Sequence, residues 1–511
     1  MNHSDPLIAS HQLVQILKGF PIDFLKVYPQ SVCSLNGLIY GLIRTSEGKQ
    51  LMVTGEKNRV LSDDFQGKCY HRTSSLKLCD LSSENTECLM AFFPHTRPVP
   101  LRKYPFTIGT GDRLGVATPG HLQAVAKFNV RPVLAQQSVR ENTQTGRNFR
   151  EVVCDAAWSV FQENYQKGYG ADGDHLKSIG EVKSALEAGI SMVTLDLSEK
   201  LNFETYLAPK EEVDRKFKEE IDEGDAEVIF HLFLGKTFSF KGPHGELSIQ
   251  FNEESVKRNA LLFHKAIDFT EEVYEWIRSE KGNHDPIDFE VSVDETPFPT
   301  SAENHFFFIL QLSQRGVRVD SLAPRFVGEF QKGVDYRGDI ESFRRHFYQH
   351  VLIAKDYGNY KLSIHSGSDK FSAFPHMGEL AGGKLHLKTA GTSWLEAVRL
   401  VAMINPSLYR EMHQYALSKF EEASRLYHVT TQLSQIPKLE DLSDQELPSL
   451  LNHEEARQLL HITYGFLLNA KTAKGESLFR GNLYHLLARY EEDYRSLLET
   501  HFEKHLRSIG G

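Results

Sequence analysis

The sequence of 511 residues has little cysteine and no long apolar run. No apolar stretch approaches the roughly 20 residues that a helix needs to cross a bilayer, and the first residues lack the features of a secretory signal. An odd number of cysteines without a Cys-x-x-Cys pair argues against a disulfide framework and against structural zinc. These cysteines are Cys33, Cys69, Cys79, Cys88 and Cys154. We therefore expect a cytoplasmic protein that does not enter the membrane.

Basic residues are not in excess. The sequence contains 58 lysines and arginines and 68 aspartates and glutamates, so the formal net charge is −10. This balance provides no overall positive field, so we expect neither a nucleic-acid partner nor attraction to a membrane surface. The composition is that of an ordinary globular protein, with 40% hydrophobic residues. An anionic ligand would need a local cluster of basic side chains.

Short apolar runs of β type alternate with helical stretches across residues 99–404. This alternation is typical of parallel strands joined by helices, and eight such strands favour closure into a (β/α)₈ barrel of the TIM type. Helices are expected between several of the strands, for example after Ser301, where a capping pattern precedes a run of apolar residues. The predicted strands are 104–112, 131–138, 168–174, 191–198, 286–295, 316–324, 360–368 and 384–391.

Three further regions surround the predicted strands. An insertion around residues 205–283 combines charged helical stretches with the hairpin-like sequence FSFKGPHGELSIQF. Residues 1–98 are predicted to form a β-rich extension that ends at a proline-punctuated linker. Residues 405–511 are helical and carry alternating charges, a pattern typical of a solvated helical cap or a contact in a homo-oligomer.

The reactive groups of such a barrel lie at the C-terminal ends of its strands. Alternation along the seventh and eighth predicted strands turns His365 and His386 inward. His175 follows the third strand, in a predicted loop that also holds Asp172 and Asp174. Three imidazoles at one barrel mouth suit a divalent zinc, nickel, cobalt, manganese or iron ion. The alternative is that each histidine is an ordinary hydrogen-bonded residue.

The fifth predicted strand is the most acidic. Its inward residues are Asp288, Glu290, Ser292 and Asp294. A buried carboxylate must be paired, bound to metal or used in chemistry, because an unpaired buried charge is costly. Glu290 or Asp294 is therefore a candidate acid or base, and Glu295 takes this role if the register differs by one residue. A buried salt bridge to Lys361 or Lys388 is the competing explanation.

Basic residues near the same mouth are Arg113, Lys370 and Lys388. Each could recognise a substrate carboxylate or phosphate, and the alternative is a solvated surface charge. The segment GTGDRLG, which contains Arg113, resembles a phosphate-binding loop, but its glycine spacing matches neither the dinucleotide fingerprint nor the P-loop. We therefore expect no nucleotide cofactor.

Four segments at the predicted strand ends, GADGDHLKS, DFEVSVDET, LSIHSGSDKFS and HLKTAGTSWLEA, resemble the tagaturonate epimerase family. The resemblance covers roughly residues 100–410. It implies a metal-dependent enzyme of hexuronate catabolism that interconverts D-fructuronate and D-tagaturonate. The functional pattern of the family would fall on Asp174, His175, Glu290, His365 and His386.

The implied reaction inverts C4, counted from the ketose end, which is β to the ketone and is not acidified by it. Retro-aldol cleavage between C3 and C4 followed by re-addition solves this problem, with one carboxylate as base and another as acid. We assign Asp174 as base and Glu290 as acid. Transient oxidation by a nicotinamide would require a dinucleotide site. A class II type aldolase, a ketose isomerase and a non-catalytic sugar-acid-binding protein are the alternatives.

Overall fold

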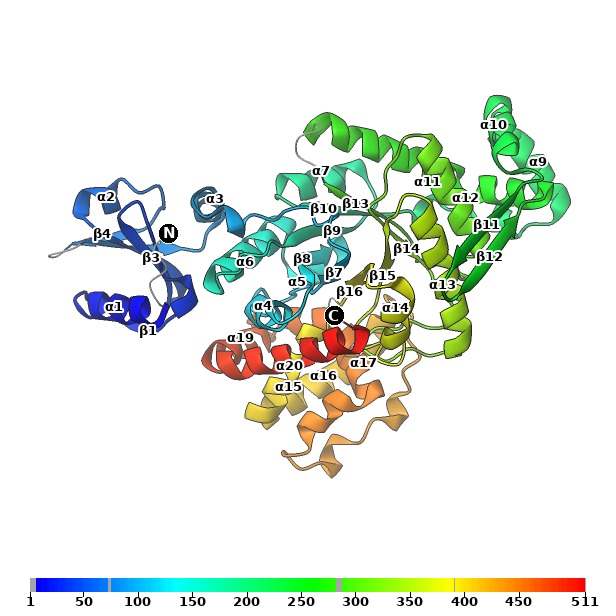
Figure 1. Ribbon diagram of the computed structural model, residues 1–511. Helices are drawn as coiled ribbons and strands as arrows, with labels where there is room; N and C mark the ends of the chain where they lie inside the picture. Colours follow the sequence, from blue (N-terminus) through cyan, green and yellow to red (C-terminus); the bar gives the residue numbers. More distant parts are fainter. Residues whose placement is uncertain (1–5, 72–74, 282–286, 390, 511) are drawn as a thin grey trace.

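Eight parallel strands close into a barrel in the structure, a computed structural model that describes residues 6–71, 75–281, 287–389 and 391–510 (Figure 1). Each predicted strand overlaps an observed one, which confirms the predicted fold class. Pro286 and Ala390, which belong to two predicted strands, lie outside the described residues. The barrel strands are β7 (Phe106–Gly109), β8 (Arg131–Ser138), β9 (Gly170–Leu176), β10 (Met192–Asp196), β13 (Asp288–Val293), β14 (Ser321–Pro324), β15 (Lys361–Ile364) and β16 (Leu385–Lys388).

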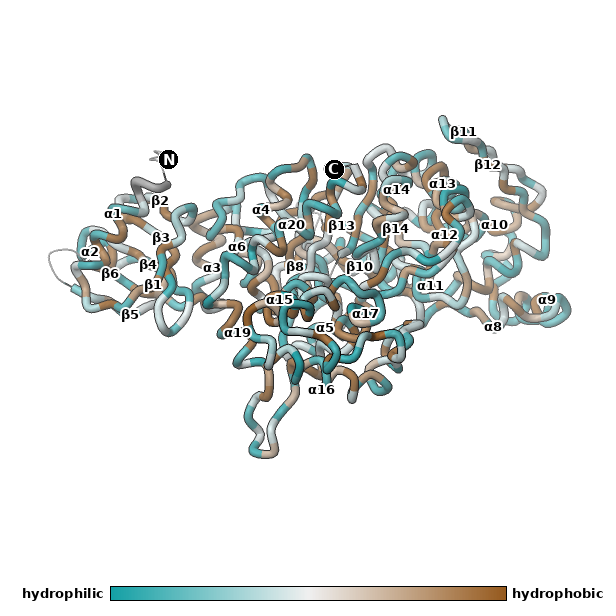
Figure 2. The backbone as a smooth tube through the Cα atoms, turned by 90° about the horizontal axis from the view of Figure 1, so that it is seen from below, coloured by the Kyte–Doolittle hydropathy of each residue, from teal (hydrophilic) through white to brown (hydrophobic). Residues whose placement is uncertain are grey.

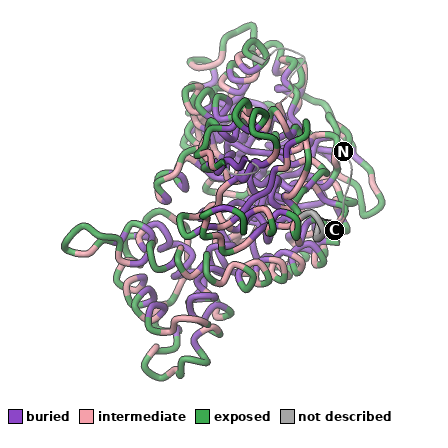
Figure 3. Tube along the Cα trace, turned by 90° about the vertical axis from the view of Figure 1, so that its left-hand side faces the viewer, coloured by how far each residue is buried: buried purple, intermediate pink, exposed green. Residues whose placement is uncertain are grey.

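The strands alternate as their apolar residues predict. Phe289, Val291 and Val293 of β13 are buried in the main hydrophobic core with residues of the surrounding helices, because alternate side chains point to the two faces of a strand. Figure 3 shows the buried residues concentrated in the interior of the molecule. The surrounding helices are α4 (Thr118–Ala126), α5 (Val139–Thr145), α6 (Phe149–Gln162), α7 (Ile179–Glu187), α12 (Ala302–Gln314), α13 (Ile340–Asp356), α14 (Phe374–Ala381) and α15 (Thr392–Ile404).

Helix α12 begins as its sequence predicts. The Ser301 hydroxyl accepts a hydrogen bond from the Asn304 main-chain N–H at 3.0 Å, and the Asn304 side chain accepts one from the Ser301 N–H at 3.3 Å. These bonds satisfy two donors that the first turn of a helix leaves free.

The insertion between β10 and β13 contains the predicted hairpin, formed by β11 (Thr237–Gly242) and β12 (Gly245–Gln250). It lies at one end of the molecule, beside α12 and α13 (Figure 1). Two of its helices coincide with the charged stretches of the sequence, and the other two do not. The helices are α8 (Phe203–Leu207), α9 (Lys210–Glu220), α10 (Glu223–Phe233) and α11 (Glu253–Lys281).

The N-terminal extension is a six-stranded sheet at the opposite end of the molecule (Figure 1). It packs on α6 of the barrel, because Tyr40 and Phe93 share a buried cluster with Trp158 and Phe161. Its elements are α1 (Pro6–Lys18), β1 (Phe24–Val27), β2 (Cys33–Leu35), β3 (Leu38–Thr45), β4 (Gly48–Gly55), α2 (Lys57–Leu61), β5 (Lys68–His71), β6 (Ser75–Asp80) and α3 (Ser83–Phe92).

The C-terminal region is helical and packs on the barrel. Trp394 and Leu395 of α15 share a second core with this region, and Phe502 and Leu506 of the last helix join the main core. The outer helices alternate between hydrophilic and hydrophobic residues (Figure 2). No helix among the described residues is both long and apolar enough to span a membrane. The C-terminal helices are α16 (Pro406–Ser424), α17 (Glu454–Ile462), α18 (Tyr464–Asn469), α19 (Arg480–Arg489) and α20 (Glu491–Ile509).

Candidate active site

A cavity of about 640 Å³ opens at the C-terminal ends of the barrel strands. Its wall includes Asp174 and His175 of β9, Asp294 after β13, His365 after β15 and Lys388 of β16. Residues from four different strands therefore converge where a barrel of this type places its chemistry.

A bulge in β9 allows two consecutive residues to face this cavity. Gly173 pairs with Val193 and Leu176 with Leu195, so β9 has one more residue than β10 between these pairs. His175 takes a φ of +54° at this irregularity. An extra residue breaks the strict alternation of a strand, and both Asp174 and His175 line the cavity. The prediction of a loop at these two residues was wrong, because β9 continues to Leu176.

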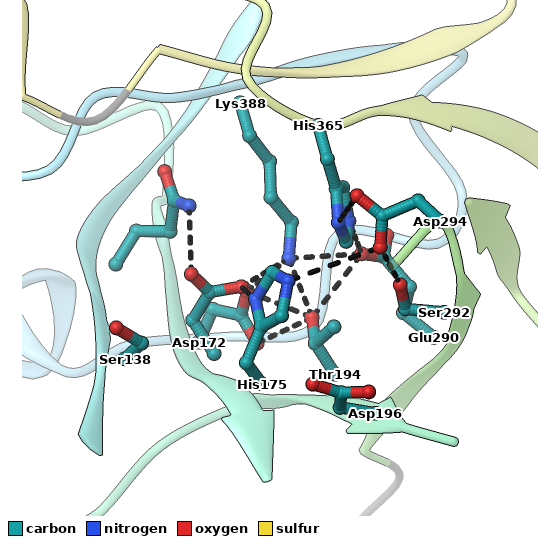
Figure 4. A network of polar contacts seen from close by, with 12 residues as sticks. Ser138, Asp172, His175, Thr194, Asp196, Glu290, Ser292, Asp294, His365 and Lys388 are labelled. Atoms are coloured by element: carbon teal, nitrogen blue, oxygen red, sulfur yellow. Dashed lines mark hydrogen bonds and ion pairs between the residues drawn. The ribbon is translucent and has the colours of Figure 1, made fainter. Parts of the chain in front are cut away.

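Two histidines and one aspartate form a candidate metal site (Figure 4). The His365 Nδ1 lies 3.3 Å from one carboxylate oxygen of Asp294, and the His175 Nε2 lies 3.9 Å from the other. The His365 Nδ1 is buried and makes no hydrogen bond within the described chain. Imidazole nitrogens with a carboxylate suit a divalent transition-metal ion, so the residues present fit the predicted metal.

Each of these two histidines also contacts a carboxylate of its own. Asp174 Oδ1 lies 2.9 Å from the Nδ1 of His175, and Glu290 Oε1 lies 2.8 Å from the Nε2 of His365. In each imidazole the other nitrogen is left to face Asp294. Carboxylates in this position orient metal-binding histidines and increase their basicity. The arrangement therefore presents one nitrogen from each ring to a common point.

The side chain of Lys388 extends toward this group, and carboxylates surround its ammonium (Figure 4). Its Nζ is 2.6 Å from Asp174, 3.0 Å from Asp172 and 2.9 Å from Glu290. Burial opposes the charge of Lys388, but the three carboxylates hold its pKa well above the usual value. Thr194 of β10 donates its hydroxyl to Asp172 at 2.9 Å. The buried salt bridge between Glu290 and Lys388 that competes with a catalytic role is thus present.

The carboxylates around Lys388 differ in their proton affinity. Burial and the neighbouring carboxylates raise the pKa of Asp172 to about 7. Burial works in the same direction on Asp174 and Glu290, but Lys388 and the histidines hold both pKa values well below the usual range. When a metal is absent, burial disfavours a charged His175, yet Asp174 raises the pKa of His175 to about 10. A site that stabilises an imidazolium also favours a bound cation.

His386 lies one layer deeper in the barrel than His365. It pairs with Ser363, two residues before His365, and its Nδ1 lies 2.9 Å from the Thr107 hydroxyl. Burial lowers the pKa of His386 to about 3, so its ring is neutral. The structure therefore brings together two of the three predicted histidines, and Asp294 completes the group.

Arg113 and Lys370 both have partners within the protein. Arg113 forms a buried ion pair with Glu141 and lies 3.9 Å from the centre of the Tyr464 ring. The Nζ of Lys370 donates three hydrogen bonds to main-chain carbonyls, at distances between 2.6 and 2.8 Å. An ammonium has three donors, so those of Lys370 are all used.

Known proteins resemble this chain over nearly its whole length. A family model described as tagaturonate epimerase matches residues 28–509. The tagaturonate/fructuronate epimerase of Thermotoga maritima is 40% identical over 501 residues, which are 97% of this chain and 100% of the relative. The native crystal structure of a fructuronate-tagaturonate epimerase from Cohnella laeviribosi is 45% identical, with a TM-score of 0.90 over 98% of this chain and 99% of that one. The chain therefore belongs to the tagaturonate epimerase family.

Proposed function

We propose that the chain interconverts D-fructuronate and D-tagaturonate in hexuronate catabolism, and that a divalent metal ion assists the inversion of C4. Membership of the family makes the chain an epimerase, and both relatives are named for these two sugar acids. The observation that carries the metal dependence is the paired arrangement of His175 and His365, each held by a carboxylate and facing Asp294.

C4 of the ketose is β to the ketone, so removal of its hydrogen would give no stabilised anion. Cleavage between C3 and C4 instead turns C4 into an aldehyde and leaves the bonding electron pair as an enolate, whose negative charge is shared by C3 and the ketone oxygen. His175, Asp294 and His365 would hold the ion, which when bound supplies a Lewis acid for this charge. Rotation of the aldehyde fragment and re-addition to its other face then invert C4.

The proton transfers at the C4 oxygen are assigned to residues that face the cavity. Asp174 lines the cavity, and its Oδ2 has only a long contact of 3.5 Å with Gln136, so we assign it as the base. Glu290 is fully buried, with its oxygens bonded to His365 and to Ser321. We therefore propose that Glu290 orients His365, and that Glu295, which lines the cavity, is the acid.

Product analysis tests the function. The purified protein is treated with EDTA and supplied with Mn²⁺, Ni²⁺ or Zn²⁺, and fructuronate is then followed by NMR. We expect tagaturonate as the product, the same equilibrium mixture from either sugar acid, and no turnover before metal is added. Three-carbon fragments as the final product would indicate an aldolase, and an aldose product would indicate a ketose isomerase.

A non-catalytic sugar-acid-binding protein would bind fructuronate and leave it unchanged. His365→Ala separates this alternative from the proposal, because it removes one proposed metal ligand. We expect the variant to lose bound metal and turnover together. His244→Ala, on the hairpin of the insertion, is the matched control and should retain both.

A further inference from the structure

One lysine on the cavity wall has no partner among the residues that the structure describes. Lys332 belongs to the segment between β14 and α13 and lines the cavity. Its side chain is half-buried, and within the described part of the chain its Nζ makes no hydrogen bond, ion pair or ring contact. Holding a cation out of water without a partner is unfavourable. An unpaired ammonium on the wall of a binding cavity therefore indicates that an anionic ligand binds there.

The main chain around Lys332 is held firmly in place. Lys370 donates to the carbonyls of Gln331 and Val334, at 2.8 and 2.6 Å. Gln458 donates to the carbonyl of Lys332 itself at 3.1 Å. Arg457 of α17 donates to the next carbonyl, that of residue 333, at 3.0 Å. Buried polar side chains thus fix four consecutive residues, which positions the ammonium without neutralising it.

The other cations near the cavity already have partners. Arg325 donates to the main-chain carbonyl of Thr296, and Arg140 lies over the ring of Tyr427 at the rim. Lys388 is held by three carboxylates, and Arg113 by Glu141. Among the described residues, each of these four cations has a side-chain partner or a carbonyl acceptor, and Lys332 has neither.

The charges around Lys332 favour an incoming anion. Burial, followed by the neighbouring Arg140, lowers the pKa of Lys332 from its usual value. Glu141 opposes this lowering, but Arg113 already pairs with its carboxylate. An anion placed beside Lys332 would replace the lost hydration and stabilise the charge.

We propose that Lys332 binds the carboxylate of the sugar-acid substrate. This inference rests on the proposed function. The carboxylate of the substrate is only two carbon atoms beyond C4, so its binding group must face the same space as the reacting carbon. Lys332 meets this requirement, since Asp174 contributes to its electrostatic environment and both residues line one cavity.

Comparison of a charged and a neutral inhibitor tests the role of Lys332. Gluconate and sorbitol have the same carbon skeleton and differ at one end, where gluconate has a carboxylate. Lys332→Met should raise the KM for fructuronate and weaken inhibition by gluconate roughly 10- to 100-fold, the equivalent of one hydrogen bond to a charged group. Inhibition by sorbitol should not change. Lys241→Met, on the exposed hairpin, is the control.

Equal weakening of both inhibitors, or unchanged inhibition by gluconate, would overturn the assignment. Circular dichroism and elemental analysis establish that the variant is folded and contains metal. Lys332→Gln provides a second neutral variant. If the wild-type protein does not convert fructuronate, the proposed function fails. Calorimetric titration with gluconate then still measures whether Lys332 binds a sugar carboxylate, so the two failures are distinguishable.

Discussion

Replacement of Lys388 by methionine should destabilise the protein strongly at neutral pH. Methionine preserves most of the volume but removes the cation that lies within 3.0 Å of Asp172, Asp174 and Glu290. Loss of one partner from a buried ion pair costs about 3–5 kcal/mol, because the remaining charge is uncompensated. We expect the free energy of unfolding to fall by about this amount, more than for a typical substitution.

The loss should shrink as the pH falls. Lys388 holds the pKa values of Asp174 and Glu290 well below the usual range. Without the lysine, the pKa values of both carboxylates in the folded protein rise above those in the unfolded chain. The ionised carboxylates then destabilise the fold at neutral pH, and their protonation removes this destabilisation as the pH falls. The wild-type protein also gains stability as the pH falls, because Asp172 has a pKa of about 7 and becomes protonated. The informative quantity is therefore the difference between the two proteins.

Urea denaturation at about pH 7.5 and about pH 5 measures this difference. EDTA is present in one series, so that a bound divalent ion does not compensate for the missing charge. Lys241→Met is the control, because its side chain is 79% exposed. A loss below about 1 kcal/mol at neutral pH, or a loss that is the same at both pH values, would refute the account of Lys388 as the buried counter-ion.

Three further variants separate the roles of the cavity residues. Asp294→Asn should reduce bound metal at least roughly tenfold, as measured by elemental analysis after dialysis, because it removes the carboxylate between the two histidines. Glu295→Gln should retain metal and lower kcat by roughly 100-fold or more if Glu295 is the acid, and unchanged kcat would contradict that assignment. His386→Ala should retain metal, since His386 contacts Thr107 in a deeper layer, and metal loss equal to that of His365→Ala would place it among the ligands.

Much of the barrel could be predicted because its strands alternate regularly between polar and apolar residues. The inward positions of Glu290, His365 and Lys388 follow directly from that alternation, and these side chains meet in the structure. The same regularity explains the error at His175. A bulge adds one residue to β9 without a clear sign in the sequence, so the strand continues where a loop was expected.

The level of a side chain along the barrel axis is harder to predict than whether the side chain points inward or outward. The relative level of His365 and His386 depends on the register between β15 and β16, which pairs Ser363 with His386. The sequence predicts an inward Asp294 as a candidate acid or base, and the structure places it beside His175 and His365. Lys332 had no signal in the sequence, because its placement depends on partners more than 100 residues away in α17. The cytoplasmic location and a homo-oligomer stay predictions.

The support of the cavity wall by the last helices has a consequence for biosynthesis. The N–H of Asp369, beside Lys370, donates to His505 of α20 at 3.0 Å, and α17 holds the segment that carries Lys332. The eight strands are synthesised before either helix, since proteins are made from the N-terminus. A growing chain can therefore form barrel structure on the ribosome well before its substrate cavity is complete. Catalytic competence should arise only after α17 and α20 have been synthesised.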